Sequence, residues 1–252
     1  MCAVKLSNNR IKEIIKLHQK KYRDESGLFL AEGEKILEEI LNSDINIKEI
    51  IALEGFNSEK INYPYIFVDE NIMKKITTTS TLCNVLVVAE KKSIDISQIK
   101  TKKKIALFDS ISDPGNLGTI IRSAAAFGIE GIILYGNCVD LYSPKVIRSC
   151  AGNFLKIPVV FIKNIEELNK NFKDYTKIST AIYEKNNISI KETARIEKYI
   201  VMFGSEASGL QEELVKIADK NIRLQMENNV ESLNLSVSAS IIFYELFLNN
   251  FI

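Results

Sequence analysis

Three segments in the second half of the chain combine glycines with polar side chains in a way that suits ligand binding. They read "SDPGNLGTIIR" at 112–122, "GSEASGLQ" at 204–211 and "MENNVESLNLS" at 226–236. Glycines let main-chain N–H groups approach a ligand closely, and a following helix start offers further N–H donors to an anion. The candidates for chemistry that we single out there are a guanidinium, a carboxylate, two amides and a hydroxyl, which belong to Arg122, Glu206, Asn116, Asn234 and Ser232.

Each of these side chains also has an ordinary structural explanation. "DPGNLG" is typical of a turn, and it matches neither G-x-G-x-x-G nor a P-loop. Arg122 lies six residues past Asn116 inside a predicted helix, where it either points to the mouth of the loop or forms a surface ion pair. Glu206 suits the first turn of a helix, and Ser232 and Asn234 are good N-cap residues. Residue types alone leave ligand binding and local capping both open.

The rest of the composition excludes several chemistries. His18 is the only histidine in 252 residues, which excludes a histidine-based catalytic triad and a metal site with several histidines. Cys2, Cys83, Cys138 and Cys150 are far apart and form no C-x-x-C pair, so neither a zinc site nor a disulfide framework is indicated. We therefore expect no bound metal.

The three segments follow a repeated pattern of strand, loop and helix that begins near residue 100. Helices are predicted at 119–128 and 210–220, between strands that read "KIALFD", "GIILYG", "IPVVFI", "ISTAIY", "YIVMFG" and "IRLQM". This alternation indicates an α/β domain at 99–252, with a mostly parallel sheet covered by helices on both faces. Ligands of such sheets bind at the carboxyl ends of the strands, where the three segments fall.

Residues 231–242, "ESLNLSVSASII", fit two structures. Apolar and small polar residues alternate there with the period of a half-buried strand, yet the chain continues as "IIFYELFLNNFI" with the apolar positions of a buried helix. The pattern alone leaves strand and helix open.

The first hundred residues read as a small α/β domain at 1–98, followed by a polar linker. A helix is predicted at 8–22, a strand and a helix within 27–43, and strands at 47–53, 65–68 and 84–90. Residues 1–24 hold seven Lys or Arg against two acids, a local charge of +5 in a chain of net charge +1. These cations suit either RNA phosphates or a solvated helix face, and the candidate phosphate contacts are Lys12, Lys16, Lys20, Lys21 and Arg23.

No apolar run approaches the ~20 residues that span a bilayer, and the N-terminus lacks the pattern of a signal peptide. We expect a cytoplasmic protein without a membrane partner.

The three segments, in this order and spacing, resemble the three motifs of the SpoU/TrmH family of RNA 2′-O-ribose methyltransferases in the SPOUT superfamily. "SPKVIRSCAGNFLKIPV" at 143–159 is similar to the stretch between the first two motifs. Residues 8–41 are similar to the substrate-binding domain of the ribosomal-RNA members. The resemblance thus covers almost the whole chain.

This resemblance implies an S-adenosylmethionine-dependent enzyme that methylates 23S ribosomal RNA. It also implies a C-terminal trefoil knot, an L7Ae/L30e-like N-terminal domain and a homodimer formed through the C-terminal domain. In the family the ESLN segment ends the knot and begins the last helix, so the alternation at 231–242 should not be a strand.

Residue by residue, the resemblance assigns Arg122 to the ribose 2′-hydroxyl, with the substrate phosphate helping to take the proton. Asn116 and Glu206 would position Arg122 and the nucleotide, and Ser232 and Asn234 would orient the ribose. The cofactor pocket would be lined, largely through the main chain, by Gly204, Ser205, Gly209, Leu210, Leu224, Met226 and Leu233.

The chain departs from the family pattern at two places. "LQM" at 224–226 replaces the usual I-P-M, which removes the proline that presets the main chain, and "TLCNV" at 81–85 replaces a sequence near T-P-Q-G-V. Three other functions stay open: the same chemistry on transfer RNA, a non-catalytic RNA-binding or ribosome-assembly protein, and a nucleotide-dependent oxidoreductase. The last lacks a dinucleotide fingerprint.

Overall fold

The computed structural model describes residues 6–56, 63–180, 187–205, 208–227 and 232–249. The chain forms two compact units, one of Met1–Ser93 with Asp140–Leu155 and one of Ile94–Val139 with Lys156–Ile252. The segment Asp140–Leu155 thus packs within the first unit, although its place in the sequence is inside the predicted second domain. The division into functional domains at 1–98 and 99–252 stays a prediction.

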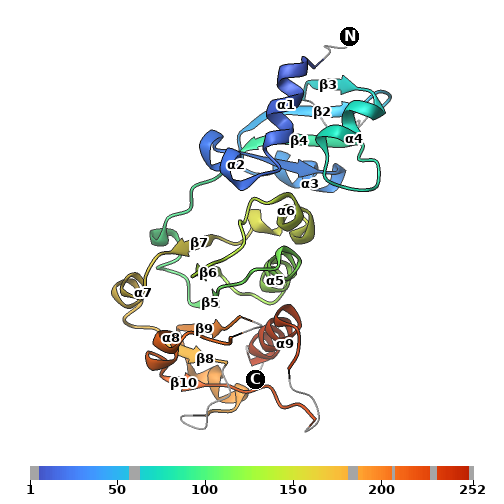
Figure 1. The fold of residues 1–252 in the computed structure, drawn as a ribbon. Helices are drawn as coiled ribbons and strands as arrows, with labels where there is room; N and C mark the ends of the chain where they lie inside the picture. The colour runs from blue at the N-terminus through green and yellow to red at the C-terminus, as the bar shows by residue number, and fades with distance from the viewer. Residues whose placement is uncertain (1–5, 57–62, 181–186, 206–207, 228–231, 250–252) are drawn as a thin grey trace. The chain divides into compact units, whose positions relative to one another are not determined.

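The first unit is built on a four-stranded mixed sheet in the order β1-β4-β2-β3 (Figure 1). Strand β4 is antiparallel to β1 and β2, whereas β2 and β3 are parallel. Runs of Ile, Leu and Val in these strands fill the buried side of the sheet. The elements are α1 (Asn8–Lys16), α2 (Lys20–Ser26), β1 (Leu28–Glu32), α3 (Glu34–Leu41), β2 (Ile47–Leu53), β3 (Tyr65–Val68), α4 (Glu70–Ile76), β4 (Val85–Glu90), α6 (Pro144–Cys150) and the 3₁₀ turn η2 (Asn153–Leu155).

The single helix predicted at 8–22 is wrong, because the chain breaks into α1 and α2. Gln19 is extended between them, with φ −101° and ψ 137°. The break leaves the carbonyl groups of Leu17 and His18 without helical partners, and the Arg23 guanidinium donates to both at 2.8 Å. A buried arginine therefore stabilises the break between the two helices, and the helical periodicity of the sequence does not reveal this break.

Aromatic contacts hold the segment Asp140–Leu155 in the first unit. The ring of Phe29 in β1 lies 4.9 Å from that of Tyr142 and 5.9 Å from that of Phe154. The Tyr142 hydroxyl donates to the Lys92 carbonyl at 2.9 Å, and burial raises the pKa of this phenol to about 12. The segment is thus part of the apolar core of the first unit.

The second unit is built on a six-stranded sheet in the order β10-β8-β9-β5-β6-β7, in which every pair of neighbours is parallel. This agrees with the α/β fold predicted from the alternating pattern. The elements are η1 (Ile96–Gln98), β5 (Lys104–Asp109), α5 (Pro114–Ala126), β6 (Gly131–Tyr135), β7 (Val159–Ile162), α7 (Ile165–Asn171), β8 (Thr176–Ser179), η3 (Ile190–Arg195), β9 (Tyr199–Phe203), α8 (Glu212–Lys216), β10 (Lys220–Asn221) and α9 (Leu235–Leu248).

Helices cover both faces of this sheet (Figure 1). On one face Phe243 of α9 packs against Phe108 of β5 and Phe203 of β9, with ring centroids 6.5 and 5.7 Å apart. On the other face Leu168 of α7 and Leu214 of α8 close a second apolar cluster. Burial on both sides explains why the strands read as continuous apolar runs.

Two predicted boundaries in the second unit are wrong. "DPGNLG" is not a loop but the cap and first turns of α5, because Asp113 accepts from the Asn116 N–H at 2.8 Å and Pro114 suits the first helical position. "IRLQM" is not a strand, since β10 ends at Asn221 and residues 222–227 form neither helix nor strand.

The ambiguous segment at 231–242 is helical from Leu235 onward. The Asn234 side chain caps α9 by accepting from the N–H groups of Ser236 at 2.9 Å and Val237 at 3.3 Å. The predicted trefoil knot stays a prediction, because residues 228–231 lie outside the described part of the chain. Within that part, no helix has the length and apolar content required to cross a bilayer.

Candidate active site

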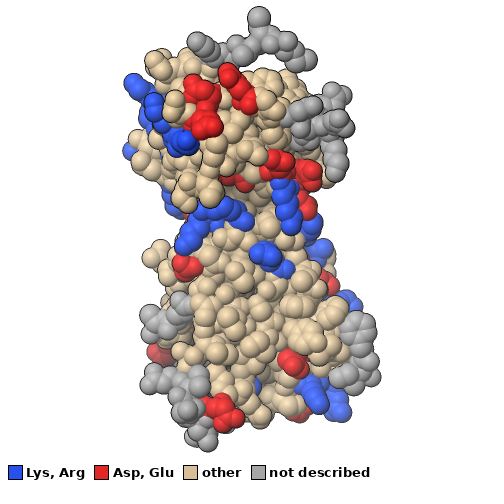
Figure 2. All heavy atoms as spheres, turned by 90° about the vertical axis from the view of Figure 1, so that its right-hand side faces the viewer, with Lys and Arg blue, Asp and Glu red and all other residues tan. Residues whose placement is uncertain are grey.

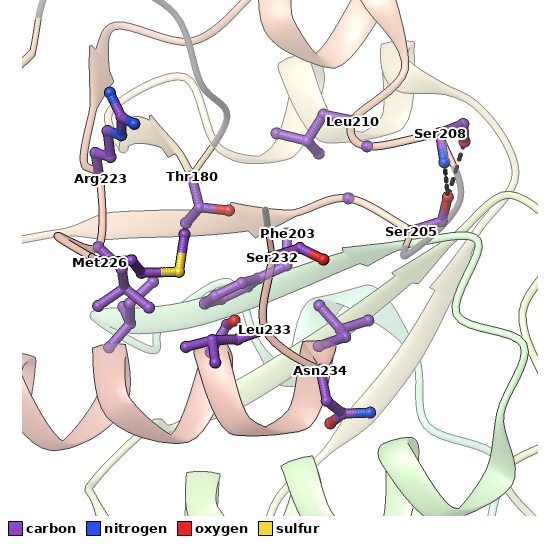
Figure 3. A pocket seen from close by; sticks show the side chains of 16 residues that line it. Thr180, Phe203, Ser205, Ser208, Leu210, Arg223, Met226, Ser232, Leu233 and Asn234 are labelled. Atoms are coloured by element: carbon purple, nitrogen blue, oxygen red, sulfur yellow. Dashed lines mark hydrogen bonds between the residues drawn. The ribbon is translucent and has the colours of Figure 1, made fainter. Parts of the chain in front are cut away.

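A cavity of about 690 Å³ opens at the carboxyl ends of β8 and β9, between Thr180 and Phe203 on one side and Leu233 and Asn234, before α9, on the other (Figure 3). The chain runs from β5 outward to β6 and β7 and then crosses to β8 and β9 on the other side of β5. The strand order therefore reverses between β5 and β9. Open parallel sheets bind ligands outside the strand ends at such a reversal. The cavity volume is also that of a small-molecule site.

One wall of the cavity is a tight loop that follows β9. The N–H groups of Ser205 and Gly209 donate to each other's carbonyl groups at 3.0 Å, which closes the loop at its base. A Cβ atom at Gly204 would lie 2.0 Å from the main-chain carbon of Gly209, so only glycine fits there. Gly209 has φ +68°, and a Cβ atom there would meet no other atom within 4 Å, so its main chain is open on that side. Glu206, the predicted acidic residue of this loop, lies outside the described residues.

All seven residues predicted to bind the cofactor line this cavity. Figure 3 shows Arg223 and Ser208 at opposite ends, with Ser232 and Leu233 between them. The predicted cofactor-binding residues on its walls are Gly204, Ser205, Gly209, Leu210, Leu224, Met226 and Leu233.

The sequence analysis did not single out the other lining residues, although Ser208 and Leu235 lie inside the second and third motifs. Ile242 and Leu235 are ordinary apolar positions of a helix, and Arg223 lies in a run that reads as a strand. The lining residues without a sequence prediction are Thr180, Phe203, Ser208, Arg223, Leu235, Ser238 and Ile242.

The first and third motifs meet through a hydrogen bond between two amides. Asn234 Nδ2 donates to Asn116 Oδ1 at 3.0 Å, while Asn234 Oδ1 accepts from the first turn of α9. Asn234 therefore caps a helix, as its residue type allows, and also contacts a second polar side chain. Its contact with the ribose stays a prediction. Ser123 of α5 and Ser240 of α9 form a further hydrogen bond at 2.6 Å, which fixes the two helices to each other.

Two other predicted site residues present accessible polar groups. Ser232 lines the cavity and is exposed. Arg122 is an exposed residue of α5, and no hydrogen bond or ion pair of its guanidinium is found within the described ranges. Six residues of helix separate Arg122 from Asn116, a rise of about 9 Å. The surface ion pair that the sequence left open for Arg122 is absent from the described part of the chain.

The basic residues predicted to contact RNA divide into two groups. Lys12, Lys16, Lys20 and Lys21 are exposed on α1 and α2. By contrast, Arg23 is only 2% exposed, and its guanidinium donates to Asp140 at 2.7 and 2.8 Å. Because a buried, paired guanidinium cannot reach a phosphate, the prediction for Arg23 is corrected to a structural role.

An aromatic ring lies among the exposed lysines. The ammonium groups of Lys16 and Lys21 lie 5.3 and 5.8 Å from the centroid of the Tyr22 ring. Lys20 instead pairs with Asp24 at 2.7 Å, and this contact lowers the pKa of Asp24. Positive charge beside a flat ring suits both the phosphates and the bases of RNA.

The cavity fits S-adenosylmethionine in size and in chemistry. Apolar side chains such as Leu210, Met226 and Leu233 can pack against an adenine ring, and the glycine loop offers main-chain groups to its polar edge. Among the described residues, no group of three or more His, Cys, Asp or Glu side chains is arranged to hold a metal ion.

Solved structures of two methyltransferases have the same fold as this chain. The AdoMet-bound rRNA methyltransferase from Sinorhizobium meliloti superposes with a TM-score of 0.85 at 27% identity, over 96% of this chain and 95% of that one. AviRb from Streptomyces viridochromogenes, in complex with AdoMet, superposes with a TM-score of 0.87 at 22% identity, over 97% and 99%. The fold and the cavity thus define a SPOUT-class methyltransferase.

The sequence places the chain within that class. Residues 103–244 match the SpoU rRNA Methylase family, and residues 8–86 match the MRM3-like substrate binding domain. The chain belongs to the SpoU rRNA methylase family. It is 30% identical to the 23S rRNA (guanosine(2553)-2′-O)-methyltransferase RlmP of Bacillus subtilis, over 95% of this chain and 96% of that protein.

These comparisons confirm the predicted family, α/β fold, enzyme class and cofactor. The protein is an RNA ribose 2′-O-methyltransferase that uses S-adenosylmethionine.

Proposed function

We propose that the protein methylates the 2′-hydroxyl of a ribose in 23S ribosomal RNA, in the cytoplasm. The observation that carries this proposal is the Asn116–Asn234 hydrogen bond, which joins the first and third motifs beside the cavity. Similarity to RlmP, whose name specifies 23S rRNA, over nearly the whole length of both chains supports the choice of RNA.

When bound, S-adenosylmethionine would supply an activated methyl group to the ribose 2′-oxygen and would leave as the thioether S-adenosylhomocysteine. The hydroxyl proton would be taken up beside Arg122 with the help of the substrate phosphate. The protein has to align the ribose and favour loss of that proton. In our proposal the exposed Arg122 guanidinium contacts the 2′-hydroxyl, and Ser232 and Asn234 orient the ribose. Asn116 holds Asn234 in place and, together with Glu206, positions Arg122 and the nucleotide.

The first unit captures the RNA in this proposal. Lys12, Lys16, Lys20 and Lys21 provide phosphate contacts that do not depend on base sequence, and Tyr22 provides a ring for base stacking. The match of residues 8–86 to a substrate-binding domain supports this role.

We also propose a homodimer formed through the second unit. Val237, Ile241 and Tyr244 are 46%, 38% and 46% exposed on α9, at a spacing that puts them on one stripe of the helix. Figure 2 faces the side of the unit that carries α5 and α9, and this surface is largely free of charged side chains. Homodimer interfaces are more apolar than the rest of a protein surface, which is why this stripe is the candidate.

Sedimentation tests the dimer. We expect the wild type to sediment as a dimer at micromolar concentration and the Ile241→Glu/Tyr244→Glu variant as a folded monomer, because two carboxylates would be desolvated in the interface. A Lys163→Glu exchange on an exposed loop serves as the control. A monomeric wild type would refute this part of the proposal.

Mapping of ribose methylation in ribosomal RNA tests the substrate. RNA from a strain that lacks the protein should lose one alkali-resistant linkage in 23S RNA, and expression of the protein should restore it. Loss of a linkage in transfer RNA, with ribosomal RNA unchanged, would reassign the substrate. Unchanged methylation of both RNAs would contradict the proposed substrate.

A further inference from the structure

A buried carboxylate that is not among the predicted site residues lies next to the glycine loop. Asp109, the last residue of β5, is 1% exposed. Its Oδ2 accepts from the main-chain N–H of Gln211 at 2.8 Å, and its Oδ1 accepts from Gln211 Nε2 at 2.7 Å. Gln211 follows Leu210 directly, so these two bonds connect the end of the central strand with the wall of the cavity.

No cation compensates this carboxylate within the described part of the chain. Besides Gln211, the donor to Asp109 is the Ser110 hydroxyl, at 2.8 Å from Oδ1. Burial of a carboxylate costs free energy unless it is hydrogen-bonded, so the three neutral donors must hold a fixed geometry. A carboxylate kept in such a place is expected to position whatever donates to it.

Gly136 packs tightly against the hydrogen-bonded groups of Asp109, Ser110 and Gln211. A Cβ atom at Gly136 would lie 2.5 Å from Ser110 Oγ and 3.2 Å from both Asp109 Oδ1 and Gln211 Nε2. Ser110 has φ +55°, a left-handed conformation that costs free energy for a residue with a side chain. The main chain is thus strained where it brings the hydroxyl to the carboxylate.

A second hydrogen bond, close to Asp109, attaches helix α8 to strand β6. The Tyr135 hydroxyl donates to the Glu213 carboxylate of α8, and this bond raises the pKa of Tyr135 to about 12. Both ends of the connection between the glycine loop and α8 are therefore tied to the strands β5 and β6.

We propose that Asp109 is a positioning residue for the methyl donor: through Gln211 it fixes the main chain of Ser208–Leu210, the described end of the glycine loop, in the conformation that binds S-adenosylmethionine. Gly204 allows the loop to fold back on itself, Ser205 and Gly209 close its base, and Asp109 holds its exit. This inference rests on binding of S-adenosylmethionine in the cavity but not on the identity of the RNA.

Three variants of the full-length protein test the proposal: Asp109→Asn, Gln211→Glu and the double variant, which exchanges the carboxylate and the amide between the two positions. Asp109→Asn places an amide against the amide of Gln211, and Gln211→Glu places two carboxylates together. In the double variant the amide at position 109 can donate to the carboxylate at position 211, while its oxygen still accepts from the main-chain N–H of residue 211. Asp174→Asn, an exposed carboxylate paired with Lys198, is the matched control.

Calorimetry with S-adenosylmethionine is the measurement. Each single variant should bind about tenfold more weakly or worse, as expected for loss of a hydrogen bond to a charged group, and the double variant should recover most of the loss. The Gln211→Glu variant should also regain affinity from pH 8 to pH 5.5, because two adjacent carboxylates then share a proton. The control should bind like the wild type.

Two outcomes would overturn the proposal. One is a pair of single variants that bind S-adenosylmethionine like the wild type, and the other is a double variant no better than the weaker single variant. If Asp109→Asn does not fold, Gln211→Ala replaces it, since it removes only the side-chain donor; unchanged affinity there would also refute the proposal. The readout needs no RNA, so a wrong RNA substrate would leave it unaffected.

Discussion

The two units carry their candidate binding sites in different ways. The second unit holds a cavity at the ends of buried strands, where glycine main chain and a few fixed side chains form the walls. The first unit offers exposed lysines on two short helices, some already paired with acids. A cavity of fixed shape should lose its ligand when an atom is added where its wall is tightly packed, whereas a charged surface should weaken in proportion to the charges removed.

Two arginines show how surroundings decide the role of one residue type. Arg122 is exposed without a partner in the described ranges, whereas Arg23 is buried and bonded to Asp140. Removal of Arg122 should therefore affect chemistry, and removal of Arg23 should affect folding.

The largest effect is expected at Arg122. Arg122→Ala should lower the rate of methyl transfer about 1,000-fold, because loss of one group that stabilises the reacting oxygen costs that much in other enzymes. Binding of S-adenosylmethionine should stay the same, which calorimetry checks against the rate measured with labelled cofactor. Equal loss of binding and rate would assign Arg122 to the cofactor instead.

The next effect concerns folding. Arg23→Gln should lower the free energy of unfolding by about 3–5 kcal/mol, since it leaves Asp140 without its cation in a site where both side chains are almost fully buried. Urea denaturation measures this change, with Lys20→Gln as an exposed control. Arg23→Gln with wild-type stability but weak RNA binding would restore the original prediction of a phosphate contact.

The glycine loop offers a matched pair of substitutions. Gly204→Ala should weaken binding of S-adenosylmethionine by about 100-fold, because its Cβ would clash with the main chain of Gly209. Gly209→Ala meets no atom and should cost only about 1 kcal/mol of strain, through its positive φ. Similar effects of the two substitutions would show that the loop adapts freely and that its shape is not the determinant.

A smaller, graded effect is expected on the first unit. Each of Lys12→Gln, Lys16→Gln and Lys21→Gln should weaken RNA binding a fewfold across sequences and lower the salt slope by about 0.7 to 0.9, the value for one lost phosphate contact. Point variants are preferable to removal of residues 1–98, because Tyr142 and Phe154 would lose the core they pack in. A salt slope that does not change in the triple variant would place RNA binding elsewhere.

The smallest effect is expected from chelation. Calorimetry with S-adenosylmethionine should give the same affinity with and without a chelator, since the described residues include no group of three or more His, Cys, Asp or Glu side chains that could hold a metal ion. Loss of binding on chelation would show that the cavity has been misinterpreted.

Sequence patterns of a few residues correctly predicted the features that depend on neighbouring residues alone. The alternating pattern gave the parallel sheet, and the glycine and N-cap types at Gly204, Gly209 and Asn234 marked the cavity. Non-local features had no such signal. The break near Gln19 depends on Arg23, and Arg23 depends on Asp140, 117 residues away.

Asp109 and Gln211 illustrate the same limit at the site. Each is unremarkable in the sequence, one ending an apolar run and one preceding a helix. Only the pairing of β5 with β9 brings them together, and strand order cannot be derived from periodicity. A polar residue at the carboxyl end of a central strand is the one local feature that could have suggested Asp109.

Methyl transfer in vitro tests the proposed reaction most directly. Purified protein is incubated with methyl-labelled S-adenosylmethionine and unmodified 23S ribosomal RNA, and the labelled nucleotide is isolated after alkaline hydrolysis. We predict label in one alkali-resistant dinucleotide, the mark of a ribose 2′-O-methyl group, and its absence with Arg122→Ala. Label on a base, or no label in any RNA from a protein that binds S-adenosylmethionine, would contradict the proposed reaction.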